Sequence, residues 1–208
     1  MSTVNGGMNV LPIGPLMTEH RLIEQMIRLV GKEVASIKEK GEANTDLIGE
    51  AVNFLKVYAD ECHHGKEEDI LFKYLSEKKM SSEHRRTMDE LVKEHALGRK
   101  NVRELASLVK SYRQGESDKL GDITGIMEKL AVFYPKHIEK EDKHFFIPCM
   151  EYFTGKEQEK MLDEMWQFDK TLIHKHYASI VKNWENSSRS LPWGLQKESS
   201  KRTGRQAA

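Results

Sequence analysis

The chain has 208 residues, of which 38% are apolar and 32% are charged, a composition that suits one globular domain with a sizeable core. Its formal net charge is zero, and Lys and Arg alternate with Asp and Glu, so the sequence lacks the basic surface that binds nucleic acid. No apolar run approaches the roughly 20 residues of a membrane span, and the start lacks a signal-peptide core. We therefore expect a cytoplasmic protein whose partners include neither nucleic acid nor a membrane.

The first half of the chain predicts two amphipathic helices. Residues 1–15, with two prolines and a Gly-Gly pair, are expected to form an irregular N-terminal arm. Apolar residues recur at helical spacing from Leu16, and His20 stands in this stripe where an apolar residue is expected. The pattern then breaks and resumes in a second helix, for which Asn44 or Thr45 is the expected N-cap.

The second half predicts three more helices. The third has the most regular apolar stripe, and His95 occupies one of its core positions. Pro135 lies within the fourth, which predicts a kink or a break in the helix nearby. A capping box at residues 154–157 predicts the start of a fifth helix over about residues 155–185. Residues 186–208 are polar and small, and we expect them to form a disordered tail.

A His-x-x-x-Glu pattern occurs in both the second and the fourth predicted helix. Aligned on their histidines, the two stretches share Lys three residues on, Glu four residues on, an acidic residue five residues on and Phe nine residues on. This register pairs His63 with Glu67 and His137 with Glu141, at i and i+4 on one helix face. Each helix can therefore offer an imidazole nitrogen and a carboxylate to a common point.

A lone histidine precedes each pair at a similar distance. His20 lies 43 residues before His63, and His95 lies 42 residues before His137. This duplication predicts an all-α, up-down-up-down four-helix bundle of two related halves over residues 16–185, with the fifth helix added at its C-terminal end. All six ligand-type residues are then expected at one level of the bundle.

Six such side chains in one layer favour a metal centre over isolated core histidines. Unpaired carboxylates buried there would cost on the order of several kcal/mol each, and coordination would remove that cost. A buried His–Glu hydrogen-bond network is the alternative, but it does not require two matched halves. Imidazole and carboxylate suit iron, manganese, zinc or copper. Six ligands on four helices can hold two ions about 3.5–4 Å apart.

These motifs resemble those of the hemerythrin-like family, whose members are also called HHE cation-binding domains. The resemblance covers about residues 12–150, and the matching residues are His20, His63, Glu67, His95, His137 and Glu141. It implies a four-helix bundle around a non-haem di-iron centre, two iron ions bridged by oxide or hydroxide, that binds oxygen or related small molecules. The fifth helix is similar to extensions in prokaryotic members.

The sequence departs from the oxygen-carrying members at two positions. Those carriers have a second His one turn after the His of the third helix, where this chain has Arg99. Their last carboxylate is an Asp in the place of Asp142, whereas the internal repeat favours Glu141. The centre is thus one imidazole short, which leaves either an open coordination position or a vacancy for a residue from elsewhere.

His174 in the fifth helix is our candidate for that vacancy, as a seventh ligand or as a group that orients one. The surrounding residues 174–177 are similar to a His-containing motif of extended family members. His64 and His144 neighbour the ligand pairs, but α-helical spacing predicts that they point to other faces. The two cysteines are expected to be reduced, buried thiols.

The resemblance implies a protein that binds or senses oxygen, nitric oxide or peroxide, with a separate redox or signalling partner. The alternatives are a di-iron enzyme, namely a peroxidase, reductase or oxidase, and an iron-handling protein. Turnover of peroxide or nitric oxide by the iron-loaded chain separates an enzyme from a binder.

Overall fold

A computed structural model describes the backbone of residues 11–189 and the side chains of residues 11–172. Every regular element in this part of the chain is a helix, so the all-α prediction is confirmed for it. The chain divides into two compact units after Phe168, and the helical bundle belongs to the first unit.

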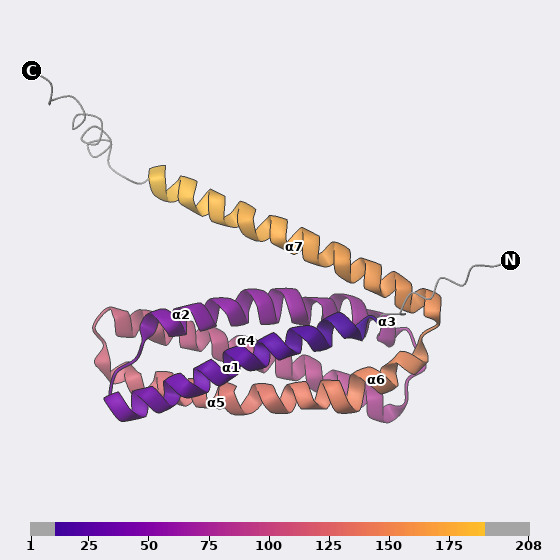
Figure 1. The fold of residues 1–208 in the computed structure, drawn as a ribbon, viewed down its shortest axis with the longest axis horizontal. Coiled ribbons are helices and arrows are strands. Elements are labelled where there is room, and N and C mark those ends of the chain that lie inside the picture. Colours follow the sequence, from indigo (N-terminus) through magenta and orange to yellow (C-terminus); the bar gives the residue numbers. More distant parts are fainter. Residues whose placement is uncertain (1–10, 190–208) are drawn as a thin grey trace, which may run out of the picture. The chain divides into compact units, whose positions relative to one another are not determined.

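Four long helical segments of the first unit lie side by side (Figure 1). The first segment is α1 (Ile13–Lys40), the second joins α2 (Thr45–Phe54), η1 (Leu55–His64), η2 (Glu67–Phe72) and α3 (Lys73–Ser76), and the third is α4 (Ser82–Arg113). The fourth contains η3 (Ser117–Lys119), α5 (Leu120–Glu139), η4 (Lys140–Phe145), α6 (Phe146–Cys149) and η5 (Met150–Tyr152), and α7 (Gly155–Arg189) follows it. Helix α5 packs against both α1 and α4, and α4 packs against α2.

Local signals in the sequence set the helix ends. Asn44 is the N-cap of the second segment, where its side chain accepts a hydrogen bond from the backbone N–H of Leu47 over 3.1 Å. Gly41 ends α1 with φ = 73°, a left-handed conformation that suits glycine. The capping box is present before α7, because the backbone N–H of Thr154 donates to Glu157 over 2.8 Å.

A polar layer separates the apolar core into two clusters. In α1, Leu16 belongs to one cluster and Ile23 to the other, and His20 lies between them. The other three segments are arranged in the same way, since the buried polar residues at the boundary between their clusters include His63, Glu67, His95, His137 and Glu141. The bundle therefore holds all six predicted ligand residues at one level.

Three stretches of the second and fourth segments are π-helical, with i→i+5 hydrogen bonds. They carry three of the six residues of the polar layer: η1 contains His63, η2 begins at Glu67 and η4 contains Glu141. Single π-helical turns are rare and occur frequently at functional sites. The α-helical period, on which the sequence analysis relied, does not apply in these stretches.

The fourth segment is helical through Pro135. Helix α5 ends at Glu139 and continues directly into η4. The lost backbone N–H of the proline is therefore accommodated without a break in the helix. Helix α7 ends at Arg189, and the rest of the predicted tail lies outside the described residues.

Candidate metal centre

The structure brings the six predicted residues together in the interior of the bundle. His20, Glu67, His95 and Glu141 have no exposed surface, His63 is 1% exposed and His137 is 2% exposed. Two imidazoles and one carboxylate come from the first two segments, and the other three side chains come from the third and fourth.

Eight atoms of these residues face one another without a hydrogen bond. They are the Nε2 atoms of the four histidines and both carboxylate oxygens of Glu67 and Glu141, and all eight are buried. Buried polar atoms nearly always have a partner, and an unpaired buried carboxylate is costly. A set of imidazole nitrogens and carboxylate oxygens that converges in this way fits metal ions of the iron, manganese, zinc or copper type.

Glu67 and Glu141 each present one oxygen to each half of the bundle. Oε1 of Glu67 lies 3.2 Å from Nε2 of His63, and its Oε2 lies 3.3 Å from Nε2 of His95. Glu141 is placed in the same way, with Oε2 3.2 Å from His20 and Oε1 3.3 Å from His137. The centre thus consists of two half-sites that share two carboxylates.

The first half-site contains His20 and His63, and the second contains His95 and His137. The ring centroids are 4.5 Å apart in the first pair and 4.9 Å apart in the second. Each half-site therefore offers two imidazole nitrogens and one oxygen from each carboxylate, a donor set that could hold a metal ion.

Each histidine of the centre is oriented by a carboxylate behind it. Nδ1 donates a hydrogen bond to an acidic side chain, in the pairs His20–Asp142 (2.7 Å), His63–Glu19 (2.9 Å), His95–Glu68 (2.6 Å) and His137–Glu94 (2.8 Å). In the neutral imidazole with Nδ1 as the donor, the lone pair of Nε2 is directed at the centre. Such partners fix the tautomer and ring orientation of metal-ligating histidines.

A cation holds each of these four carboxylates in turn. The ion pairs are Arg21–Asp142, Lys66–Glu19, Arg99–Glu68 and Lys140–Glu94. The carboxylates of Asp142 and Glu68 each reach across to a histidine of the other half of the chain. The two halves are thereby joined by charge-assisted hydrogen bonds.

None of these residues was assigned to the centre from the sequence, although the internal repeat contains all of them except Arg21 and Arg99. Lys66 and Lys140 are the shared lysines three residues after the paired histidines, and Glu68 and Asp142 are the shared acidic residues. The shared Phe nine residues after each paired histidine packs against the centre. Phe72 stacks on His95 and Phe146 stacks on His20, at centroid distances of 6.0 and 5.7 Å.

The surrounding charges favour protons on the imidazoles when no metal is bound. Burial alone would lower the pKa of His20, but the hydrogen bond to Asp142 and the neighbouring Glu141 raise it to about 10. The pKa of His95 is likewise raised to about 10, against the effect of burial, by Glu141 and Glu68. Burial would raise the pKa of Glu141, yet the adjacent imidazoles hold it well below its usual value. Metal binding must therefore release protons.

The prediction that His64 points away from the centre is wrong. Its side chain is 2% exposed and stacks on the His95 ring, with the centroids 4.0 Å apart and the planes at 11°. One ring nitrogen of His64 lies within 4.8 Å of a nitrogen of His95 and of His137. The cause is η1, because its π-helical bonds change the angular spacing and turn consecutive histidines inward.

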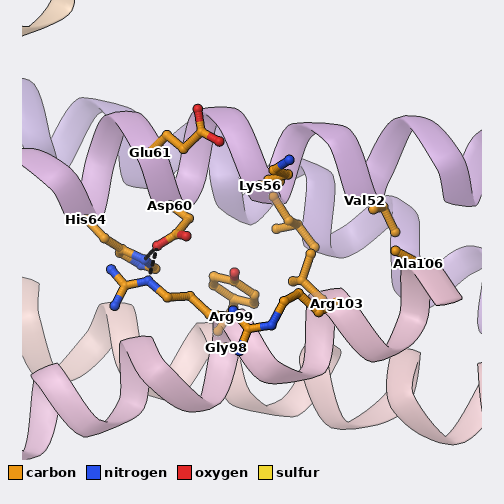
Figure 2. A pocket seen from close by; sticks show the side chains of 12 residues that line it. Val52, Lys56, Asp60, Glu61, His64, Gly98, Arg99, Arg103 and Ala106 are labelled. Atoms are coloured by element: carbon orange, nitrogen blue, oxygen red, sulfur yellow. Dashed lines mark hydrogen bonds and ion pairs between the residues drawn. The ribbon is translucent and has the colours of Figure 1, made fainter. Parts of the chain in front are cut away.

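Arg99, at the position of the missing imidazole, binds carboxylates and does not enter the centre. Its Nε donates to Asp60 over 2.6 Å (Figure 2). Its Nη2 donates to Glu68 over 2.8 Å. The choice between Glu141 and Asp142 is also clear in the structure, since Glu141 faces the centre and Asp142 lies behind His20.

The remaining histidines differ in what the structure describes of them. His144 is exposed, as the sequence analysis expected. The side chain of His174 lies outside the described residues, so its assignment stays a prediction. Cys62 and Cys149 form no disulfide, and burial raises the pKa of the Cys149 thiol to about 12.

Comparison with known families agrees with the geometry. A family model described as "Hemerythrin HHE cation binding domain" matches residues 11–175, a range that contains all six residues of the centre. No curated protein and no solved structure matches the chain. Within the described residues, no helix is long and apolar enough to cross a membrane.

Proposed function

Because the chain belongs to the hemerythrin HHE cation-binding family, we propose that it is a non-haem di-iron protein that binds or senses oxygen, nitric oxide or peroxide. Each of the two half-sites would hold one iron ion. The bundle follows the up-down-up-down order, which the short connections between its segments support.

The eight unpaired buried atoms are the observation that carries this proposal. Four imidazole nitrogens and four carboxylate oxygens exceed what one ion can bind in a regular geometry, and they divide into two groups related by the internal repeat. His20 and His63 would hold one ion, His95 and His137 the other, and both carboxylates would bridge. Two such ions supply redox chemistry and open positions for a small ligand.

The chain's own residues would set the reactivity of the centre. The four hydrogen-bonded carboxylates increase the basicity of the imidazoles and fix their orientation. The apolar clusters on both sides exclude bulk water from the polar layer. A diatomic molecule or peroxide is small enough to enter such an interior.

The test is a comparison of ligand binding with turnover. The full chain is loaded with ferrous iron without oxygen and then exposed separately to oxygen, nitric oxide and peroxide, while the optical spectrum and the consumption of each are measured. A binding or sensing protein gives a stoichiometric spectral change with each effective ligand and no sustained consumption. Sustained turnover of peroxide or nitric oxide contradicts the proposal and assigns an enzyme, and no spectral change with any of the three rejects both.

A further inference from the structure

The two half-sites match closely until the residue that follows each paired histidine. This residue is His64 in the second segment and Ile138 in the fourth, and both are buried, with 2% and 3% of their surfaces exposed. Ile138 belongs to the apolar core, whereas His64 lies against His95 and His137. The second half-site therefore has a potential donor that the first half-site lacks.

The position of His64 suits a ligand of the same ion as His95 and His137. The three side chains each offer a nitrogen within 4.8 Å of the others. A metal-bound imidazole nitrogen lies about 2.0–2.1 Å from its ion, so nitrogens on one ion are separated by up to about 4.2 Å. The three nitrogens would have to approach one another slightly, and the His64 ring would have to rotate out of its parallel stack on His95, to direct all three lone pairs at a common ion.

His64 is also oriented as the other histidines of the centre are. Its Nδ1 lies 3.3 Å from Oδ1 of Asp60, and Asp60 accepts a hydrogen bond from Arg99. The same guanidinium binds Glu68, which orients His95. One arginine thus supports the carboxylates behind two stacked imidazoles. This is the arrangement of carboxylate and cation found behind the four histidines of the centre.

The first half-site has no counterpart of the Asp60–Arg99 pair that supports His64. By the internal repeat, the positions equivalent to Asp60 and Arg99 are occupied by Tyr134 and Glu24. A phenol and a carboxylate cannot reproduce the carboxylate–guanidinium pair. Asp60 and Arg99, which have no counterpart in the first half-site, therefore both support His64.

A cavity of about 310 Å³ adjoins the outer side of His64. Leu55, Gly98 and Tyr134 are among the residues that line it, together with Asp60 and Arg99, and Figure 2 shows His64 beside the Asp60–Arg99 pair at this cavity. The cavity has room for a molecule the size of free imidazole. Truncation of His64 would therefore open a space that imidazole can occupy.

We propose that His64 is the third imidazole ligand of the second half-site and fills the vacancy that Arg99 leaves. This proposal rests on the proposed function, since it requires a metal in the centre. It gives one ion three imidazoles and the other ion two, so the two ions differ although the chain is internally repeated.

The test uses the full chain loaded with iron and two substitutions of His64. His64→Phe keeps a ring against His95 but has no nitrogen, and His64→Ala leaves space for imidazole. We expect Mössbauer spectra to show two distinct iron environments in the parent chain. Either substitution should change one of them and weaken the binding of one ion by at least about tenfold, a loss that even an orienting residue can cause. Free imidazole should restore the lost environment in His64→Ala only.

The exposed His144 provides the matched control, since His144→Phe should leave both environments and both affinities unchanged. Spectra and affinities of His64→Phe that equal those of the parent chain would show that His64 is only a stacking partner. Loss of an ion from His64→Ala that imidazole does not restore would also overturn the proposal, because it would show a structural role. A parent chain that binds no iron contradicts the proposed function instead, so the two failures are distinguishable.

Discussion

Nδ1 of His95 donates a hydrogen bond to Oε1 of Glu68 over 2.6 Å, although the two residues lie on different helical segments. This bond leaves Nε2 of His95 3.3 Å from Oε2 of Glu67, the residue next to Glu68 in the chain. Adjacent acidic residues in η2 thus have different tasks: one faces the centre and the other orients an imidazole of α4.

Glu68→Ala should therefore weaken metal binding without removing a metal ligand. We expect the affinity for one of the two ions to fall by about 10- to 100-fold, the usual cost of losing a residue that orients a ligand. Isothermal titration calorimetry with the metal measures this affinity. Asp69→Ala, at the exposed position next to Glu68, is the control and should bind as the parent chain does. Equal effects of the two substitutions would argue against the orienting role.

His63→Ala and His137→Ala should each cause a much larger loss of metal than His144→Ala. The first two side chains supply Nε2 atoms that converge on the carboxylates, whereas His144 is exposed. We expect each of the first two variants to retain at most one ion per chain under conditions where the parent chain retains two. Metal analysis after gel filtration measures the content. A similar loss from all three variants would refute the register of the internal repeat.

The metal-free protein should lose stability as the pH rises above neutrality. His20 and His95 have folded-state pKa values of about 10 against an ordinary value of 6.5, so folding favours their protonated forms. Their contribution is complete below about pH 6.5 and is lost as the pH rises through about 10. Urea unfolding of the chelator-treated chain over this range measures the decrease. A free energy of unfolding that is constant or rises would contradict it.

Metal affinity should change in the opposite direction over the same pH range. The imidazoles must lose their protons before they can bind an ion, so binding should become tighter as the pH rises. The pKa of Glu141 is held well below its usual value, and that carboxylate therefore stays charged throughout. Metal titrations at several pH values should show proton release that diminishes toward pH 10. Binding without proton release near neutral pH would show that the imidazoles are already neutral.

Removal of the metal should lower the melting temperature. A ligand that binds only the folded state at a thousandfold excess over its dissociation constant contributes about 4 kcal/mol, and each kcal/mol shifts the melting temperature of a chain this size by roughly 2–4 °C. We thus expect a decrease of about 10 °C on chelation. A variant with Glu67→Gln and Glu141→Gln should not respond to the chelator, because it lacks both carboxylates that face the centre. Identical melting of the loaded and chelated parent chain would exclude a tightly bound metal.

The all-α fold and the position of the six residues in one layer could both be predicted from the sequence, because both depend on the helical spacing of apolar residues. Apolar residues at helical spacing define the core, and a polar residue at a core position, such as His20 or His95, is conspicuous against it. The internal repeat then selected His63 over His64 and Glu141 over Asp142. Those choices match the side chains that converge in the structure.

The burial of His64 could not be predicted in the same way. Neighbouring residues of an α-helix point in directions about 100° apart, so only one of two adjacent histidines was expected to face the centre. In η1 the hydrogen bonds skip one more residue, and this rule fails. The sequence has no established signal for such a turn, which depends on how the segments pack.

The internal repeat contains the carboxylates behind the histidines, but the sequence does not reveal that they orient the imidazoles. Glu19 and Glu94 each precede a lone histidine, yet each one orients the paired histidine of its own half, His63 or His137. Spacing along one helix does not reveal contacts between helices. Those contacts become apparent only when the four segments are assembled.

The iron content of the chain after anaerobic loading with ferrous iron and removal of unbound metal tests the central claim most directly. The two half-sites that share Glu67 and Glu141 predict two iron ions per chain. One tightly held zinc ion per chain with no uptake of iron would contradict the di-iron assignment.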